Sequence, residues 1–259
     1  MGYGDQLIGT GLARGAKARG KRIACGDRQR IIWDQHSAEM FRGNPNIARP
    51  GSERDQDVEW VEFYKGHRIY NRQDRTKSRW EWNLDFRPTP GEVFFDSNER
   101  RNGRRFGRGF VLIEPLVETW KSVAPNKDWG RDRYQEVVDR LKADGHRVGQ
   151  FRHDTKQSLL EGVEKFRTIS FRDALAILSH AALYIGAEGG LHHGAAAVGV
   201  PGVVLFGGFI PPSVTGYEAH ANLTGGAEAC GSLSPCQHCR DAMAGISVDE
   251  VYEAAKARL

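Results

Sequence analysis

One segment of the sequence combines the residue types that bind phosphate. Glu188, Gly189 and Gly190 follow the apolar run 183–187 and precede the stretch 191–198, which consists almost wholly of small residues. Glycines at a strand-to-helix turn let backbone N–H groups come close to a ligand, and the free N–H groups and dipole of a helix N-terminus attract a diphosphate. The segment therefore predicts a diphosphate site, although glycines at such a turn can also serve only to make the turn tight.

Three cysteines near the C-terminus have a spacing that invites comparison with metal sites. Cys230, Cys236 and Cys239 form the pattern C-x5-C-x2-C, with His238 between the last two. A structural zinc site takes four ligands in a tetrahedron, and this segment provides three and an awkwardly placed histidine. We therefore expect free thiols, no stoichiometric structural zinc and no metal cofactor.

The elements that must position these residues alternate between strands and helices in the second half of the chain. Short apolar runs predict strands, and apolar residues at helical spacing with capping residues predict helices. This alternation predicts an α/β fold with a parallel sheet and right-handed crossovers. The predicted strands are 109–114, 146–151, 183–187 and 202–206, and the predicted helices are 131–143, 171–180 (capped by Ser170), 191–198 and a last helix opened by a capping box at 247–250.

The first half of the chain is less regular. A helix at 6–18 is weakened by three glycines, and strands are predicted at 21–25, 57–64 and 92–95. Residues 65–91 are polar, rich in Arg and Trp, and show no clear period. The Gly and Arg content of 102–108 fits a linker, so we expect a short first domain at 1–108 and a second domain at 109–259.

Charge is distributed unevenly between these two parts. Residues 1–108 carry 22 Lys and Arg against 15 Asp and Glu, a net charge of +7, whereas residues 109–259 carry 15 against 18, a net charge of −3. The basic part suggests an anionic partner, or it serves solubility alone. No apolar run approaches the roughly 18 residues that a membrane helix needs. We therefore expect a cytoplasmic protein without a transmembrane segment, with at most peripheral membrane contact.

Four segments resemble, in order, glycosyltransferase family 9, the ADP-heptose:lipopolysaccharide heptosyltransferase type. They are Gly4-Asp5, then Ile113-Glu-Pro115 with Lys127-Asp-Trp129, then Glu188–His193 with Ala195–Pro201, and last the cysteine-containing tail Cys230–Val251. The resemblance implies a GT-B-like architecture, in which two Rossmann-like α/β domains face each other across a cleft, here with a reduced N-terminal domain. It also implies an inverting glycosyltransferase that uses a nucleotide-diphosphate sugar as donor.

The resemblance places the donor on the C-terminal domain. Gly189 and Gly190 would supply backbone donors, Glu188 would lie near the donor sugar and phosphates, and His193 would reach the donor from the first turn of the helix. Lys127 would neutralise the charge that develops on the leaving nucleotide. The structural alternatives are a helix-dipole charge for Glu188, a core histidine for His193 and a solvated lysine for Lys127.

Two further positions follow from the same resemblance. Asp5 would be the base that takes the proton of the acceptor hydroxyl during an inverting transfer, or it would only cap the helix that begins at Gln6. Ile169 would pack on the nucleotide base, although core packing is the stronger interpretation of that residue.

The sequence departs from the family pattern, and it leaves the acceptor open. It begins at the Gly-Asp loop, which in the family follows a strand, and Glu188 and Gly189 replace the more usual Asp and Ser or Thr. The basic first part favours an anionic acceptor such as a lipopolysaccharide-type glycan. The Arg- and Trp-rich stretch 68–108 also fits a phage-type transferase acting on a modified DNA base, or a non-catalytic protein that binds nucleotide sugars or nucleic acid.

Overall fold

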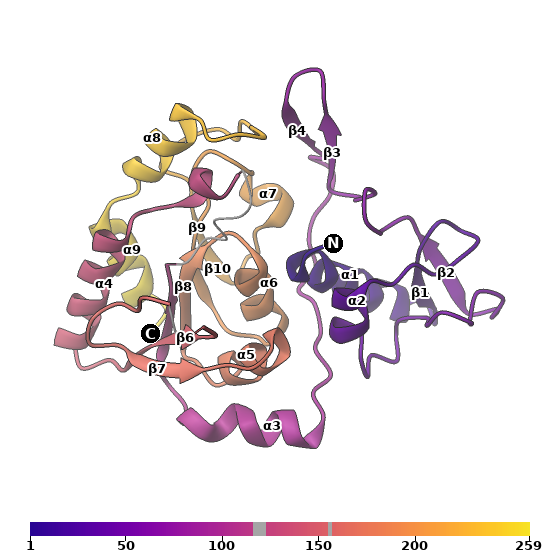
Figure 1. Cartoon of the computed structure of the whole chain (residues 1–259), viewed down its shortest axis with the longest axis horizontal. Coiled ribbons are helices and arrows are strands. Elements are labelled where there is room, and N and C mark those ends of the chain that lie inside the picture. The colour runs from indigo at the N-terminus through magenta and orange to yellow at the C-terminus, as the bar shows by residue number, and fades with distance from the viewer. Residues whose placement is uncertain (116–122, 155–156) are drawn as a thin grey trace.

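The computed structural model describes residues 1–115, 123–154 and 157–259, which form two unequal halves (Figure 1). The smaller half contains α1 (Tyr3–Lys17), β1 (Arg22–Cys25), α2 (Gln35–Met40), β2 (Val58–Val61), β3 (Asn71–Asp74) and β4 (Arg79–Trp82). The helix α3 (Ser97–Gly103) and the 3-10 turn η1 (Arg104–Phe106) lead into the larger half. That half contains β5 (Val111–Glu114), η2 (Ala124–Lys127), α4 (Arg131–Ala143), β6 (Val148–Arg152), β7 (Glu164–Arg167), α5 (Phe171–Leu178), β8 (Leu183–Ala187), α6 (Gly190–Ala197), β9 (Gly202–Leu205), α7 (Pro212–Thr215), β10 (His220–Leu223), α8 (Gln237–Gly245) and α9 (Val248–Lys256).

A six-stranded sheet with the order β10-β9-β8-β5-β6-β7 is the core of the larger half, and every pairing in it is parallel. Alternate strand residues face opposite layers, as a two-residue period requires. Leu112 and Tyr184 join the apolar cluster under α5 and α6, whereas Val111 and Ile185 join the cluster under α4 and α9. The sheet is thus covered on both faces, which accounts for its continuously apolar central strands.

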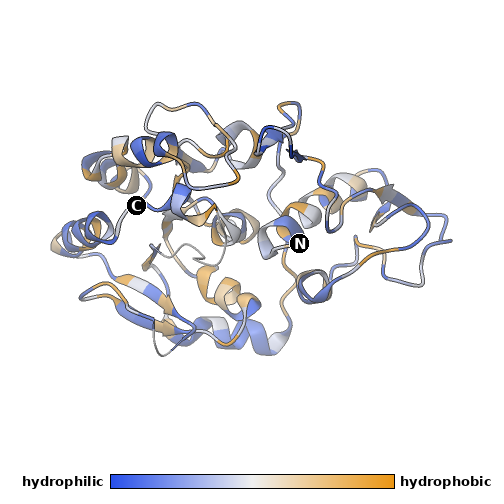
Figure 2. Ribbon diagram, turned by 45° about the horizontal axis from the view of Figure 1, so that its top comes forward, coloured by the Kyte–Doolittle hydropathy of each residue, from blue (hydrophilic) through white to orange (hydrophobic). Residues whose placement is uncertain are grey.

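Sequence patterns predicted this half well. The helix 131–143 and the strand 183–187 are observed with the expected bounds. The Ser170 hydroxyl accepts the N–H of Asp173, as the capping signal indicated, and Ser247 caps α9 in the same way through Glu250. Figure 2 shows hydrophilic and hydrophobic residues mixed along the outer helices, as expected of helices with one buried face.

The smaller half is built around α1. Its sheet, within the described residues, is the parallel pair β1-β2, and β3 and β4 form a separate antiparallel hairpin. The prediction of a strand at 92–95 is wrong, because these residues form no strand. The hairpin lies in the stretch for which the sequence gave no periodic signal.

Residues 102–108 form the end of α3 and the turn η1 rather than an irregular linker. The helix α3 packs closely on α5, because a Cβ atom at Gly103 would lie 2.4 Å from the Ala176 carbonyl oxygen. The domain boundary at residue 108 stays a prediction. In the three described ranges, no helix has both the length and the hydrophobicity needed to cross a membrane.

Candidate active site

The larger half has one topological switch point, between β5 and β8. From β5 the chain proceeds outward through β6 and β7, and from β8 it proceeds in the other direction through β9 and β10. Ligands of such sheets bind outside the carboxyl ends of the strands at this point. Lys127 lies in η2, on the connection that follows β5, and Glu188 follows β8 directly.

Lys127 and Glu188 form a buried ion pair. The Lys127 ammonium contacts Glu188 Oε2 and lies 3.3 Å from the Glu188 carbonyl oxygen, and the two side chains are 17% and 6% exposed. Burial raises the pKa of Glu188, but the attraction of Lys127 and His192 outweighs it, so the net pKa lies below the usual value. The interpretation of Lys127 as a solvated surface lysine is therefore wrong.

Gly4 allows α1 to approach the N-terminus of α6. Gly189 is the N-cap of α6, and Gly190 is its first residue. A Cβ atom at Gly4 would lie 2.9 Å from His193 Cδ2 and 3.4 Å from the Gly190 Cα. A side chain at position 4 would therefore push the two helices apart, and glycine lets the first turn of α1 lie directly on the predicted donor segment.

His193 is buried beside this contact. Its Nδ1 atom lies 2.8 Å from the Tyr217 hydroxyl, and its Nε2 atom lies 3.8 Å from Glu188 Oε1. Burial, together with the charges of His192 and Lys127, holds the pKa of His193 well below its usual value, so the ring is neutral at physiological pH. A neutral ring with one nitrogen facing Tyr217 can still donate one hydrogen bond from the other nitrogen.

Asp5 lies in the first turn of α1, close to the same place. The alternative that it caps a helix beginning at Gln6 is wrong, because the helix begins at Tyr3 and its N-cap is Gly2. The Asp5 carboxylate instead accepts the Gly2 N–H at 2.9 Å, as the third residue of the helix. The residue is 8% exposed.

Two residues that the sequence did not single out for this role hold the Asp5 carboxylate. Arg68 donates to Oδ1 at 2.8 Å and to Oδ2 at 3.2 Å, and the Tyr70 hydroxyl donates to Oδ1 at 2.5 Å. Burial and the charge of Asp5 raise the pKa of Tyr70 well above its usual value, so Tyr70 remains a donor. Both residues lie just before β3, more than 60 positions from Asp5, and local spacing gave no signal for the contact.

Ile169 lies on the surface, with 81% of its area exposed. The core-packing interpretation is therefore wrong. An apolar side chain this exposed, next to the Ser170 cap of α5, is free to contact a ligand.

The histidines near Glu188 raise the question of a metal. Suitable atoms of Glu188, His192 and His193 lie within 4.8 Å of one another. His192 Nδ1, however, accepts the Gly189 N–H at 2.9 Å, His192 Nε2 donates to the Thr215 carbonyl at 2.8 Å, and Glu188 is paired with Lys127. These groups already have partners, so the arrangement resembles a hydrogen-bonded network more than a metal site.

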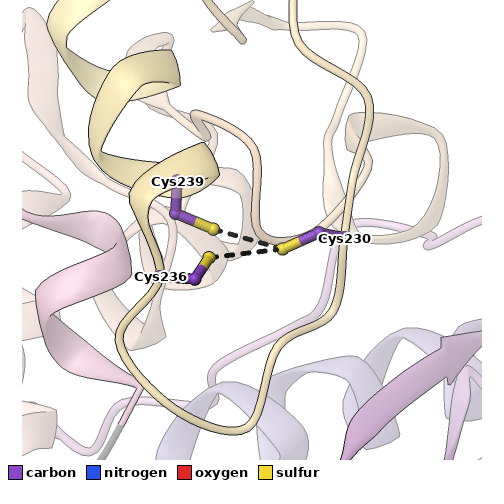
Figure 3. Close-up of side chains that lie close together, drawn as sticks. All are labelled: Cys230, Cys236 and Cys239. Atoms are coloured by element: carbon purple, nitrogen blue, oxygen red, sulfur yellow. Dashed lines mark hydrogen bonds between the residues drawn. The ribbon is translucent and has the colours of Figure 1, made fainter. Parts of the chain in front are cut away.

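The three tail cysteines come together in space, as Figure 3 shows. Cys230 Sγ lies 3.8 Å from Cys236 Sγ and 3.3 Å from Cys239 Sγ, and all three thiols are free. The loop that carries Cys230 also pairs with the β3-β4 hairpin, because Trp80 N–H donates to the Gly231 carbonyl at 2.7 Å.

Comparison with known proteins decides the family. Residues 77–245 match the family model described as glycosyltransferase family 9 (heptosyltransferase). The chain belongs to glycosyltransferase family 9. No curated protein matches the chain significantly.

A solved glycosyltransferase structure shares the fold. The iron-containing dodecameric glycosyltransferase TibC from enterotoxigenic E. coli H10407 is 17% identical, with a TM-score of 0.59 over 99% of this chain and 73% of that chain. This likeness confirms the α/β, GT-B-like fold. ADP-heptose lipopolysaccharide heptosyltransferase II of E. coli is 18% identical, with a TM-score of 0.45 over 64% of this chain and 53% of that chain. The family 9 glycosyl transferase from Veillonella parvula DSM 2008 is 17% identical, with a TM-score of 0.49 over 66% of this chain and 54% of that chain. The chain thus spans about half the length of these two structures.

Proposed function

We propose that this protein is an inverting glycosyltransferase, which moves a sugar from a nucleotide-diphosphate sugar to a hydroxyl of an anionic acceptor. The observation that carries the proposal is the contact between Gly4 and the α6 segment Gly190–His193, which sets the Asp5 carboxylate beside the predicted diphosphate site. Family membership supports the reaction class.

In this proposal the donor diphosphate binds at the N-terminus of α6. The backbone N–H group of Gly190 and the helix dipole attract it, whereas the Gly189 N–H donates to His192 Nδ1 and holds the turn in place. The Lys127 ammonium contacts the phosphates as well as Glu188. Neutral His193 donates one hydrogen bond to the diphosphate. Ile169 offers its exposed side chain to the base. Since solved TibC is described in complex with ADP-D-β-D-heptose, ADP-heptose is the first donor to test.

In the proposed chemical step, Asp5 is the base. The acceptor hydroxyl takes the place of the Tyr70 hydroxyl at Oδ1 and gives its proton to the carboxylate as its oxygen attacks the anomeric carbon. The bond between that carbon and the diphosphate oxygen breaks, and the configuration inverts. Arg68 holds the second carboxylate oxygen and keeps the carboxylate oriented.

We also propose that the transfer requires no metal. Negative charge develops on the leaving diphosphate. Lys127, His193 and the α6 dipole stabilise this charge. These groups supply the electrostatic stabilisation that a divalent cation would otherwise provide.

The acceptor site in this proposal is a hollow at the β3-β4 hairpin, connected to Asp5 through Arg68, which lines the hollow and binds the Asp5 carboxylate. Its volume is about 340 Å³, and its lining residues are Arg68, Ile69, Asn71, Arg72, Glu81, Trp82 and Asn83. Arg72 is 83% exposed at its side chain and pairs with Glu81, an exposed ion pair worth under about 1 kcal/mol that an anion can displace. Trp82 offers an apolar face. A phosphorylated lipopolysaccharide-type glycan fits this chemistry. In this proposal the protein reaches the glycan from the cytoplasm by peripheral contact with the membrane. A nucleic-acid acceptor is the alternative.

Thermal stabilisation by nucleotide sugars tests the proposal. Binding to the native state raises stability with ligand occupancy. We expect ADP-heptose and ADP to raise the Tm. A panel of ADP, UDP, GDP and CMP sugars without any effect would contradict the donor assignment.

A further inference from the structure

Phe209 lies between the two parts of the proposed site. It belongs to the segment after β9 and is buried, with 4% of its area exposed. The Trp82 ring of β4 packs edge-on against it, with 5.7 Å between the ring centroids and an interplanar angle of 82°. The Lys127 ammonium lies 5.1 Å from the centroid of the same Phe209 ring. One side chain therefore contacts both the hairpin that lines the proposed acceptor hollow and the lysine of the proposed donor site.

Backbone hydrogen bonds also hold the segment that carries Phe209 against the hairpin. The Gly231 N–H donates to the Phe209 carbonyl at 3.0 Å, and the Trp80 N–H donates to the Gly231 carbonyl at 2.7 Å. These bonds connect β4 to Phe209 through a single residue, and Figure 1 shows β4 as the strand of the hairpin nearer the larger half. The hairpin thus fixes Phe209 at its backbone as well as at its ring.

The Phe209 ring restrains the Lys127 side chain. An ammonium over an aromatic ring is attracted by the negative face of the ring. The same ammonium contacts Glu188 Oε2 and lies 3.3 Å from the Glu188 carbonyl oxygen. An ammonium has three N–H donors on a flexible four-carbon stem, and Glu188 and Phe209 together limit the positions that this stem can take.

We propose that Phe209 is a positioning residue, whose ring holds the Lys127 ammonium in the orientation that binds the donor diphosphate, and that Trp82 holds the Phe209 ring in turn. This inference rests on the proposed function, because it takes Lys127 as a donor-binding residue. A lysine that is already oriented loses less conformational entropy when the diphosphate binds. The hairpin of the smaller half therefore contributes to donor affinity through Phe209.

Calorimetric titration of the whole chain with ADP tests the proposal. We expect Phe209→Leu to weaken ADP binding by about 2- to 10-fold, the range expected when one long side chain has to be ordered on binding. Phe209→Tyr keeps an aromatic face and should bind ADP more tightly than Phe209→Leu. Trp82→Leu should weaken ADP binding by a smaller factor. Phe110→Leu changes a buried phenylalanine directly before β5, at the opposite end of that strand from η2, and should leave ADP affinity unchanged.

Two further measurements separate positioning from a general loss of packing. In the Lys127→Ala background, Phe209→Leu should cause no further loss of ADP affinity, because the lysine that it positions is gone. A trifluorinated phenyl ring at position 209, introduced by amber-codon suppression, nearly keeps the shape of the buried side chain and weakens the negative face of the ring. We expect this protein to bind ADP more weakly than wild type while its Tm stays close to the wild-type value.

The outcomes distinguish this inference from the proposed function. The inference alone would be overturned if Lys127→Ala weakened ADP binding but the trifluorinated protein bound ADP as tightly as wild type. An equal effect of Phe209→Leu with and without Lys127 would overturn it as well. Unchanged ADP affinity in Lys127→Ala would instead refute the donor role of Lys127 in the proposed function, and this inference with it.

Discussion

Glu114 provides a test of the electrostatics beneath the site. It ends β5 at the switch point, is fully buried, and accepts the Phe151 N–H at Oε1 from 2.6 Å. Burial raises the pKa of Glu114 to about 8, although the Phe151 hydrogen bond acts in the opposite direction. Because of this raised pKa, we expect the wild-type protein to become less stable as the pH rises from 5 to 8. We predict that the Glu114→Gln variant loses much less stability over the same pH range.

The sign and size follow from linkage. A carboxyl with a raised pKa in the folded state contributes stability that is fully present below the unfolded pKa and is lost as pH rises through the folded pKa. The pKa of Glu114 rises from 4.5 to about 8, and each pKa unit corresponds to about 1.4 kcal/mol. The pH-dependent loss of unfolding free energy that Glu114 causes is therefore at most roughly 5 kcal/mol. Relaxation of the site reduces this value, so we expect the Gln variant to gain roughly 2–4 kcal/mol over wild type between pH 5 and pH 8.

Urea unfolding of both proteins at several pH values measures the effect. Burial lowers the pKa of His192, His193 and His220. These histidines therefore make the folded protein less stable as the pH falls below about 6.5, which is opposite to the effect of Glu114. Taking the difference between the Gln variant and wild type cancels their contribution. Glu218→Gln changes an exposed glutamate and is the control. A Glu114→Gln difference that does not grow with pH would refute the reasoning.

Three further predictions concern the site. Lys127→Ala and His193→Ala should each weaken ADP binding by about 1–3 kcal/mol in calorimetric titration, because each removes a polar contact from the diphosphate; unchanged affinity in both variants would move the diphosphate elsewhere. Gly4→Ala should lower turnover and cost about 1–3 kcal/mol in unfolding, since its Cβ would meet His193 at 2.9 Å. Gly2→Ala, whose Cβ would come no closer than 3.9 Å to another group, is its control, and equal effects in the two would contradict the helix-contact argument. The acceptor KM should rise steeply between about 50 and 200 mM salt while the donor KM changes much less, and a flat acceptor response would indicate a neutral acceptor.

The sequence predicted the parts of the fold whose signal is local. In α4 the apolar residues recur at helical spacing, and in β8 an unbroken apolar run matches a strand buried on both faces. In the β3-β4 hairpin, by contrast, polar and aromatic residues face solvent and the second half of the chain, so no periodic apolar pattern marks it. Its pairing with the loop at Gly231 depends on a contact between segments about 150 residues apart.

The candidate site also combines features that local sequence marks with features that depend on contacts between distant segments. The position of Glu188, Gly189 and Gly190 between β8 and α6 was predictable, because a strand, two glycines and a helix follow one another in the chain; their contact with a donor stays a prediction. The partners of Asp5 were not, because Arg68 and Tyr70 reach it only after the chain has folded around α1. The pairing of Lys127 with Glu188, 61 positions apart, likewise depends on the strand order at the switch point.

The role of Asp5 as the base is the central claim, and a single-turnover measurement tests it most directly. Asp5→Asn keeps the size of the side chain and removes the group that accepts the proton, whereas Asp139→Asn changes an exposed aspartate on α4, on the other face of the sheet. With saturating ADP-heptose and acceptor, the account predicts that Asp5→Asn transfers the sugar about 10²–10⁴-fold more slowly than wild type, with ADP affinity unchanged and Asp139→Asn fully active. Transfer by Asp5→Asn at a rate close to that of wild type would contradict it.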